Sequence, residues 1–460
     1  MIRTERFLIK PLTLDDVTQK YLDWFKEDIT KLYITAASNT QSIQSLREFI
    51  IERIGRKDVL FLGIFVASSG AHIGNVKFEP INIESRSAVV GILVGEKDWR
   101  ARGVATEVLD ACFDWLYFNR SIETLILKVD KFNSPAIRAY EKAGFVIEST
   151  QEISGEQRSF HKMSRQRPRN AHRFALGTAQ FGLKYGVANH SGQVSIGEIS
   201  AILDASLDAG MDSIDTAMAY GHSEEILGQS GVNRWRVITK LPPVPKNVAD
   251  VEKWVNEAIT NSLIRLRVSC LEGLLLHRAS DMCGPKGEQL HNAMLALKRQ
   301  GIVKKIGVSI YHPEELETLI GKRQIDLVQA PFSVVDRRIM TSGWMKRLHE
   351  LGIELHIRSI FLQGLLLSEE LQQDPRFCKW NTLWDTWLSW LKEERLTSLQ
   401  ACLGFVLGHP EINRIVIGVD KKNQLTEILS ALQIGKLSLP DCLASTDLEL
   451  IHPSRWVSAK

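Results

Sequence analysis

Two side chains suited to proton transfer lie in the run SIDTAMAYG, from Ser213 to Gly221. They are Asp215 and Tyr220, and a lysine and a histidine follow at Lys240 and His277. A free tyrosine has a pKa of roughly 10 and is a poor acid near neutral pH. A neighbouring ammonium stabilises the phenolate, so a lysine beside the ring makes the phenol a better proton donor.

These four residues can divide the work of reducing a carbonyl group. Lys240 can supply the charge next to Tyr220, and Asp215 can keep the lysine protonated and oriented. His277 can donate a hydrogen bond to the carbonyl oxygen. Taken singly, each has a structural explanation, as a helix cap, a half-buried ring, a solvated charge or a core histidine. Together they favour carbonyl reduction.

A barrel of parallel strands would position this set. Eight short β-rich runs alternate with helical stretches, namely 174–178, 213–216, 237–240, 273–277, 305–309, 327–329, 354–358 and 415–418. This pattern, in about the length required, predicts a (β/α)₈ TIM barrel, in which chemistry sits at the carboxyl ends of the strands. Asp215, Lys240 and His277 fall at three consecutive ends, so we expect a shared pocket.

A different signature stands in the first third of the chain, at RARGVAT from Arg100 to Thr106. Small residues there let backbone N–H groups approach an anion, and a helix beginning near Thr106 points its positive end at it. A diphosphate would fit, although a plain strand-to-helix loop is the alternative. Strand-like runs at 60–67 and 88–94 beside helical stretches predict a mixed α/β domain.

A second element follows in this part of the chain, after a predicted strand at 124–129. Ser134 and Pro135 form an N-cap and first-turn pair, Gly144 ends the helix, and Tyr140 lies inside it. Tyr140 can be a mere aromatic on the helix face, or a proton donor if the preceding turn binds a cofactor.

Composition limits the partners. With 57 Lys+Arg against 54 Asp+Glu the formal net charge is only +3, which argues against nucleic-acid binding. The N-terminus is too charged for a secretory peptide, and no apolar run is long enough to span a membrane. The six cysteines are scattered without a CxxC pair and predict neither disulfides nor a metal site. We expect a cytoplasmic protein.

The stretch SRQRPRNAHR, residues 164–173, loses apolar periodicity and contains Pro168 and four arginines. It predicts a basic linker between a domain at 1–163 and a barrel at 174–460. A solvated loop inside one domain is the alternative.

The chain from Phe174 onward resembles the aldo-keto reductase family, through LGTAQFG (176–182), SIDTAMAYG, ITK (238–240), LLLH (274–277) and KIGVS (305–309). The resemblance implies NADPH as hydride donor, Tyr220 as proton donor, and Ser309 and Gln329 on the nicotinamide carboxamide, with Phe332 near the ring. The residues implied for the phosphate and adenine end are Arg358, Gly364, Gly418, Lys421, Lys422, Gln424 and Glu427. Ile310 and Ile428 stand where the family usually has asparagine.

The first part of the chain resembles the GNAT superfamily of N-acetyltransferases, a mixed α+β fold, through R-x-x-G-x-A and N-S-P-A-x-x-x-Y. The resemblance implies that acetyl-CoA lies with its pyrophosphate over Arg102, Gly103, Val104, Ala105 and Thr106. It also implies that Asn133 contacts the pantetheine arm and that Tyr140 protonates the leaving thiolate. Glu79, at the end of a predicted strand at 73–78, is the candidate base, or else a surface carboxylate.

These observations predict a bifunctional enzyme that joins an acetyl-CoA-dependent N-acetyltransferase to an NADPH-dependent carbonyl reductase. Because both reactions are used to build modified amino sugars, we expect a nucleotide-linked sugar for a bacterial surface glycan as substrate. One alternative is an aldehyde-detoxifying reductase fused to a protein or small-molecule acetyltransferase. The other is a cofactor-sensing domain that regulates one active enzyme.

Overall fold

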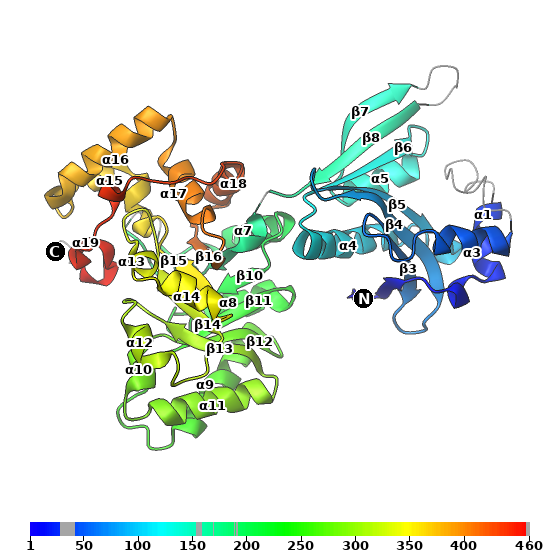
Figure 1. The fold of residues 1–460 in the computed structure, drawn as a ribbon. Helices are drawn as coiled ribbons and strands as arrows, with labels where there is room; N and C mark the ends of the chain where they lie inside the picture. The colour runs from blue at the N-terminus through cyan, green and yellow to red at the C-terminus, as the bar shows by residue number, and fades with distance from the viewer. Residues whose placement is uncertain (28–41, 153–158, 169, 188, 190–191, 457–460) are drawn as a thin grey trace. The chain divides into compact units, whose positions relative to one another are not determined.

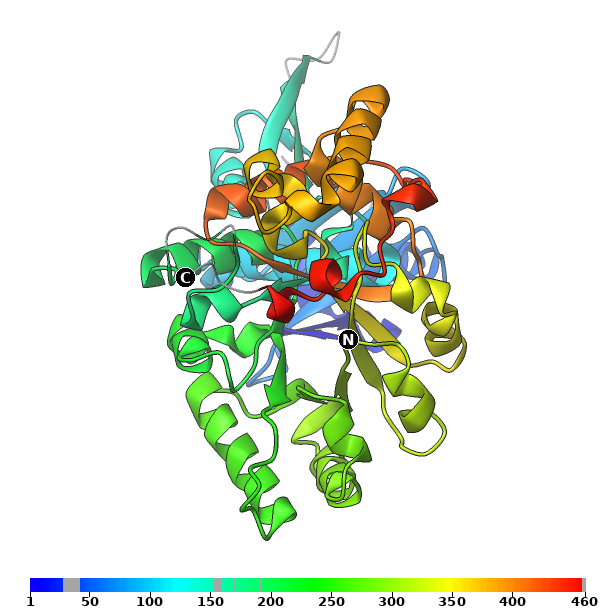
Figure 2. The same cartoon turned by 90° about the vertical axis from the view of Figure 1, so that its left-hand side faces the viewer.

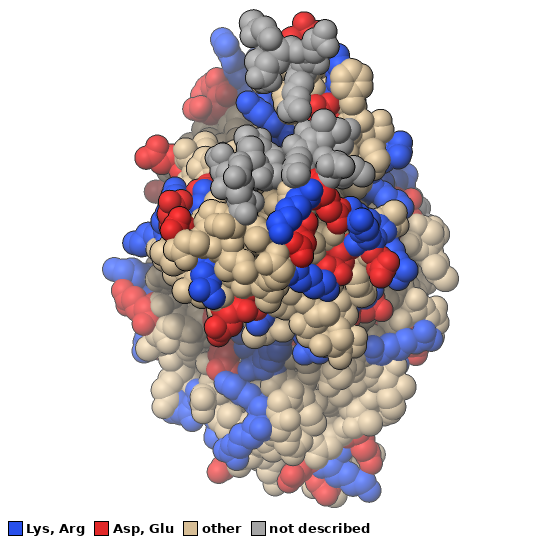
Figure 3. Space-filling view, turned by 90° about the vertical axis from the view of Figure 1, so that its right-hand side faces the viewer, with Lys and Arg blue, Asp and Glu red and all other residues tan. Residues whose placement is uncertain are grey.

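The computed structural model describes residues 1–27, 42–152, 159–168, 170–187, 189 and 192–456. The chain divides into two compact units, Met1–Arg167 and Pro168–Lys460, shown in Figure 1. Neither unit has, among the described residues, a helix long and apolar enough to cross a bilayer. On the face drawn in Figure 3, acidic and basic side chains are interspersed.

The first unit is built on one mixed sheet with the strand order β1-β2-β3-β4-β5-β6-β8-β7. Its strands are β1 Ile2–Arg3, β2 Phe7–Pro11, β3 Leu60–Val66, β4 His72–Asn82, β5 Ser87–Val94, β6 Thr124–Asp130, β7 Val146–Glu152 and β8 Ser159–Gln166. Its helices are α1 Gln19–Lys26, α3 Ile43–Ile51, α4 Val104–Arg120 and α5 Ser134–Lys142.

The alternation of side chains along the strands gives this sheet two apolar faces. Ile64 belongs to the core under α4, whereas its neighbour Phe65 belongs to the core under α1 and α3. Successive residues of a strand point to opposite faces, so a continuous apolar run such as β3 is buried on both. Helix α4 contributes Val108, Cys112 and Leu116 at helical spacing.

The second unit is a closed barrel of eight parallel strands, in the order β10-β11-β12-β13-β14-β15-β16-β9. The strands are β9 Phe174–Gly177, β10 Ser213–Asp215, β11 Arg236–Leu241, β12 Leu271–Leu276, β13 Val303–Ser309, β14 Leu327–Pro331, β15 Glu354–Arg358 and β16 Ile412–Gly418. Each overlaps one of the predicted runs, so the α/β fold class and the TIM barrel are confirmed.

Helices surround these strands, as Figure 2 shows. They are α6 Ala179–Gly182, α7 Ile196–Asp208, α8 Ser223–Ser230, α9 Val251–Leu266, α10 Ser280–Cys283, α11 Gly287–Arg299, α12 Glu315–Leu319, α13 Arg338–Thr341, α14 Trp344–Glu350, α15 Glu369–Gln372, α16 Asn381–Glu394, α17 Ser398–Leu407, α18 Lys422–Ala431 and α19 Leu448–Ile451. One continuous apolar cluster joins helices and strands.

The segment expected as a linker, 164–173, differs from that expectation. Ser164–Gln166 complete strand β8, and the two units meet at Arg167 and Pro168. The arginines there are not solvated spacers, because Arg165 pairs with Asp110 at 2.5 Å and Arg167 pairs with Asp114, both on α4. Ala171–Arg173 form a short 3₁₀ turn that already belongs to the barrel unit, and Arg169 lies outside the described residues.

Candidate active site

The carboxyl ends of neighbouring barrel strands bring the predicted proton-transfer residues together. Asp215 is the last residue of β10, Lys240 is the last but one of β11, and His277 directly follows β12. Tyr220 comes from the turn between β10 and α8. Parallel strands of a barrel present these ends on one face, and the register aligns Asp215 with Ile238, two residues before Lys240.

Lys240 and Asp215 form a buried ion pair. The Lys240 Nζ donates to Asp215 Oδ1 at 2.6 Å and to the Thr216 carbonyl at 2.9 Å. Both residues are almost inaccessible, at 1% and 4% exposure. Burial works against the ammonium, but the Asp215 carboxylate outweighs it and raises the pKa of Lys240 above its ordinary value. The lysine therefore stays charged beneath the pocket.

Tyr220 and His277 lie above this pair. The Lys240 Nζ is 5.2 Å from the centroid of the Tyr220 ring, and the Tyr220 and His277 rings meet edge to face with centroids 5.8 Å apart. Burial, together with the positive charges of Lys240 and Arg358, lowers the pKa of His277 to about 4. A neutral imidazole at this position can donate a hydrogen bond to a carbonyl oxygen without competing for the proton.

Gln329, on β14, connects this set to the opposite side of the barrel. Its side-chain Nε2 donates to Asp215 Oδ2 at 2.7 Å, which fixes the orientation of the amide. The other amide atom, Oε1, is buried and has no hydrogen-bond partner among the described residues. Ser309 on β13 is its register neighbour. A buried acceptor without a donor is costly, and a nicotinamide carboxamide would supply the missing N–H, so this position fits that group.

These residues line one cavity of about 490 Å³. The predicted residues on its wall are Asp215, Tyr220, His277, Ser309, Gln329, Arg358, Gly364, Gly418, Gln424 and Glu427. Lys240 lies beneath them as a partner of Asp215. The cavity therefore joins both ends of the predicted dinucleotide site to the proton-transfer set.

Other predicted residues lie elsewhere. Phe332 is fully buried and stacks on Phe405 with ring centroids 5.1 Å apart, so it packs the barrel against α17 and does not face the cavity. Lys421 and Lys422 are exposed at the start of α18 and are not among the lining residues. Gln424 accepts a hydrogen bond from the Asp420 backbone N–H at 2.7 Å and so caps this turn.

Two tyrosines of the wall, Tyr311 and Tyr185, were not predicted from the sequence. Tyr311 lies under the Arg358 guanidinium, with the Cζ atom 4.4 Å from the ring centroid, and stacks on His452 at 4.2 Å. Tyr185 accepts a hydrogen bond from Gln363 Nε2 at 3.3 Å. The place of Tyr311 two residues after Ser309 was a usable signal, whereas nothing in the sequence linked the distant His452 to this pocket.

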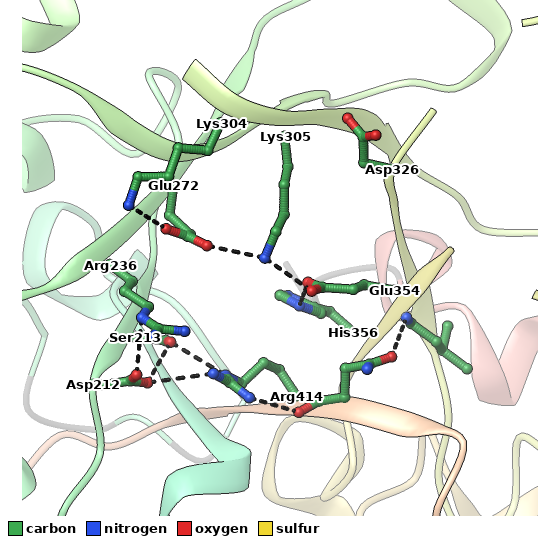
Figure 4. A network of polar contacts seen from close by, with 12 residues as sticks. Asp212, Ser213, Arg236, Glu272, Lys304, Lys305, Asp326, Glu354, His356 and Arg414 are labelled. Carbon is green, nitrogen blue, oxygen red and sulfur yellow. Dashed lines mark hydrogen bonds and ion pairs between the residues drawn. The ribbon is translucent and has the colours of Figure 1, made fainter. Parts of the chain in front are cut away.

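The opposite end of the barrel holds a separate ionic network, drawn in Figure 4. Lys305 Nζ bridges Glu272 at 2.9 Å and Glu354 at 2.8 Å, and Arg414 reaches Asp212 at 3.6 Å. These residues lie within the first three positions of their strands or, for Asp212, just before the strand. In this fold that end serves stability, and the chemistry belongs to the other.

In the first unit, two loops carry the predicted cofactor residues. Strands β5 and β6 run parallel but pair only from Ser87 to Val89 and from Thr124 to Ile126, and part beyond that point. Arg102–Thr106 follows β5, with Gly103 at φ 73° before α4 starts. Tyr140 lies on α5, which follows β6. Both loops thus leave the parted ends of adjacent strands, and the α4 amino terminus supplies N–H donors suited to a pyrophosphate.

The helix that carries Tyr140 begins at a different residue than expected. Asn133, not Ser134, is the N-cap of α5, because its Oδ1 accepts from the Ala136 N–H at 3.3 Å. Burial raises the pKa of Tyr140 to about 12, so its phenol keeps its proton at neutral pH. The ring packs against Phe145, with centroids 5.9 Å apart.

Glu79 is not a free base. Strand β4 continues past it to Asn82, and its carboxylate pairs with Arg53 and Lys77 at 2.8 and 2.9 Å and with Arg56 at 3.2 Å. Although burial opposes its charge, hydrogen bonds from Lys77 and Arg53 lower the pKa of Glu79. A carboxylate held by three cations accepts a proton poorly, so the structure gives Glu79 a structural role.

Comparison with known proteins assigns a family to each part of the chain. A profile of the Aldo/keto reductase family matches residues 173–442, and a profile of the Acetyltransferase (GNAT) domain matches residues 6–146. The chain belongs to the aldo/keto reductase family. More particularly, it is a multidomain enzyme that carries a GNAT acetyltransferase domain ahead of the reductase barrel.

Individual relatives are distant. The chain is 26% identical over 262 residues to the uncharacterized oxidoreductase YqkF of Bacillus subtilis, covering 52% of this chain and 83% of the relative. A solved aldo-keto reductase of Bacillus halodurans has 19% identity and a TM-score of 0.48, covering 58% and 88%. A chimera of the Vibrio cholerae spermidine N-acetyltransferase has 20% identity and a TM-score of 0.31, covering 35% and 96%.

Proposed function

We propose that the barrel reduces a carbonyl group with NADPH and that the first unit acetylates an amine with acetyl-CoA. The observation that carries the reductase proposal is the buried Lys240–Asp215 pair with Gln329 on the same carboxylate. It places a permanent positive charge beneath Tyr220 and an unpaired acceptor where a carboxamide is expected. An ion pair with a purely structural role would not explain why Tyr220, the neutral His277 and the unpaired Oε1 of Gln329 line the same cavity.

A bound NADPH would supply the hydride for the carbonyl carbon, and the residues of the barrel would supply and stabilise the proton transfer. The Tyr220 hydroxyl gives its proton to the carbonyl oxygen, so the C=O double bond becomes an alcohol. Lys240 stabilises the resulting phenolate, and Asp215 holds the ammonium in place. His277 orients the carbonyl by a hydrogen bond that strengthens as negative charge develops on oxygen.

NADPH is favoured over NADH by the two exposed lysines, Lys421 and Lys422, at the start of α18, where a 2′-phosphate would meet positive charge. Comparing NADPH with NADH in the wild type and in a Lys421→Gln/Lys422→Gln double variant tests this choice. The affinity for NADPH is expected to fall about 10-fold or more, with little change for NADH. An equal change for both cofactors would mean that the lysines do not recognise the phosphate.

For the transferase, Arg102–Thr106 at the start of α4 would hold the pyrophosphate of acetyl-CoA, and Tyr140 would protonate the leaving thiolate. Support comes from the left-handed Gly103 before α4 and from the burial of Tyr140, which keeps its phenol protonated at neutral pH so that a proton is present to give. Mixing acetyl-CoA with a panel of amines and measuring free thiol tests this assignment. Release of thiol that requires both an amine and Tyr140 is the expected result.

A nucleotide-linked amino or keto sugar is our proposed substrate, because one chain holds both reactions used to modify such sugars. The competing proposals are a detoxifying aldehyde reductase with an unrelated acetyltransferase, and a cofactor sensor. Measuring reduction and acetylation of nucleotide-linked sugars, simple aldehydes and protein N-termini separates these proposals. A sensor would bind its cofactor tightly and turn over none of these. A cytoplasmic location stays a prediction from the sequence.

A further inference from the structure

His356 is a buried polar side chain in the interior of the barrel that the proton-transfer chemistry does not use. It lies on β15 between Glu354 and Arg358, and side chains at every second position of a strand share a face. Because Arg358 lines the cavity, His356 points into the barrel as well. It is only 3% exposed, and Figure 4 shows it beside Glu354. His356 therefore lies between the amino-end network and the cavity.

The two nitrogens of this ring have different surroundings. Nε2 lies 3.4 Å from Glu354 Oε2, and a carboxylate can only accept a hydrogen bond. Burial lowers the pKa of His356 despite the pull of the Glu354 carboxylate, so the ring is neutral at neutral pH and has a single N–H. That N–H belongs on Nε2, facing the carboxylate, which leaves Nδ1 as an acceptor. Nδ1 is buried and has no hydrogen-bond partner among the described residues.

A second acceptor without a donor lies on the neighbouring strand. Gln329 on β14 is the register partner of His356, and it points into the barrel because its Nε2 reaches Asp215. Its Oε1 is buried and has no hydrogen-bond partner within the described part of the chain. An amide oxygen has two lone pairs, so Oε1 can accept from a carboxamide and from a second donor. A molecule with two donors would satisfy both neighbouring acceptors, and water is the smallest such molecule.

We propose that one internal water donates to His356 Nδ1 and to Gln329 Oε1, and that His356 is thereby a positioning residue for the Gln329 amide. Leu327, two residues before Gln329 on β14, forms an apolar cluster with Ile238 and Leu275, and these side chains have no donor to offer. With its Nε2 bound to a carboxylate and its Oε1 bound to the water, the amide is held in one orientation. This inference rests on the proposed cofactor site, because the fixed amide would present the remaining lone pair of Oε1 to the carboxamide.

Three substitutions of His356 in the full-length protein test which ring nitrogen matters. His356→Leu removes both nitrogens, His356→Asn keeps an acceptor near the place of Nδ1, and His356→Gln keeps a polar group only near the place of Nε2. NADPH affinity is measured by nucleotide fluorescence. We expect it to fall about 5-fold in His356→Leu and in His356→Gln, and less than about 2-fold in His356→Asn. Wild-type affinity in His356→Leu, or an equal loss in His356→Asn, would overturn the proposal.

A double-variant cycle with Gln329 separates positioning from general damage to the barrel. Because His356 acts through the Gln329 amide, His356→Leu should change the NADPH affinity of Gln329→Met by less than about 2-fold. Losses that multiply in the double variant would overturn the proposal.

His291→Leu is the matched control for the loss of a buried histidine. His291 is 7% exposed and contacts the Gln324 carbonyl at 2.9 Å, but it lies on α11 and does not line the cavity. We expect His291→Leu to lower the melting temperature and to leave NADPH affinity unchanged. An equal loss of affinity in His291→Leu would assign the effect to general destabilisation and overturn the proposal.

High-resolution crystal structures separate failure of this inference from failure of the reductase function. We expect density for a water within hydrogen-bond distance of His356 Nδ1 and Gln329 Oε1 in the wild type, and none there in His356→Leu. Wild-type density without such a water would reject the inference even in a protein that reduces carbonyls. The water together with His356-dependent NADPH affinity, in a protein that reduces no carbonyl, would retain the inference and reject the reductase.

Discussion

The Gln329 amide donates to the Asp215 carboxylate at 2.7 Å although the two residues are on opposite sides of the barrel order. Since the same carboxylate binds Lys240, one aspartate holds both the charge beneath Tyr220 and the residue expected to bind the carboxamide. In the proposed reaction, a single side chain would thereby set the positions of both the hydride donor and the proton donor.

Replacing Gln329 should mainly weaken the binding of the cofactor. In Gln329→Met the buried acceptor Oε1 is lost, and we expect the affinity for NADPH to fall about 10-fold. Gln372→Met is a matched control, because Gln372 is also a buried glutamine with an unpaired Oε1 but does not line the cavity. Fluorescence titration of NADPH measures both. An unchanged NADPH affinity in Gln329→Met would show that the carboxamide does not bind at this position.

Breaking the buried ion pair should cost stability as well as activity. Lys240→Met leaves Asp215 charged and unpaired at 4% exposure, which is expected to lower the free energy of unfolding by about 3–5 kcal/mol. In Asp215→Asn/Lys240→Met the buried charges are both gone, so much of that loss should return while reductase activity stays low. Denaturant unfolding of the wild type and of these two variants is the measurement. A double variant no more stable than Lys240→Met would contradict this account.

His277 should stay neutral over the ordinary working range. Its pKa is lowered to about 4, below the usual 6.5, so the folded protein binds fewer protons than the unfolded chain between these values. The contribution to stability is therefore full above pH 6.5 and is lost as the pH falls toward 4. We expect the pH profile of kcat/KM for the wild type to show no step near pH 6.5 that comes from His277. The profile of His277→Gln should therefore have the same shape in this range. Such a step, measured between pH 5 and 8, would show a protonated histidine in the free enzyme.

The network at the amino end of the barrel should affect stability without affecting reduction (Figure 4). Burial opposes the charge of Glu354, but hydrogen bonds from His356 and Lys305 lower its pKa to about 2. Its contribution is therefore present above the unfolded value of about 4.5 and is lost as the pH falls through about 2. We expect Glu354→Gln to lose about 1–2 kcal/mol at pH 7, with kcat unchanged. A large change in kcat with intact stability would contradict the division between the two ends.

The transferase unit allows a paired test of two residues that the sequence suggested. Tyr140→Phe is expected to reduce release of thiol from acetyl-CoA by about 10- to 100-fold, because the leaving thiolate loses its acid. Glu79→Gln should leave that rate within a few-fold and lower the melting temperature, since Arg53, Arg56 and Lys77 lose a shared partner. The reverse pattern would make Glu79 the base and Tyr140 an ordinary packing residue.

The barrel was predictable because its information is local. Each strand is a short apolar run, and the residues at the strand ends, such as Asp215 and Lys240, need only the register to meet. Phe332 was misplaced because a large aromatic just past a strand end can face either the cavity or the helices, and packing against Phe405 decides it. Tyr311 of the cavity wall stacks on His452, a residue about 140 positions away in sequence, and spacing cannot reveal such a contact.

In the first unit, the local sequence pattern predicted strands correctly but could not predict which charged side chains pair. The basic stretch at 164–167 looked solvated because its arginines have no nearby acidic residue in sequence. Asp110 and Asp114, one helical turn apart on α4, provide the partners. The sequence likewise suggested that the Glu79 carboxylate was free to act as a base. In the structure it pairs with Arg53 and Arg56, which follow α3.

Proton donation by Tyr220 is tested most directly by comparing Tyr220→Phe with the wild type. NADPH binding is measured by fluorescence, and NADPH oxidation is followed over a panel of charged and neutral carbonyl compounds. We predict turnover by the wild type, a loss of about 100-fold or more in Tyr220→Phe, and unchanged NADPH affinity. Equal turnover by both proteins would contradict Tyr220 as the proton donor. Tight NADPH binding without turnover on any carbonyl would contradict the reductase itself.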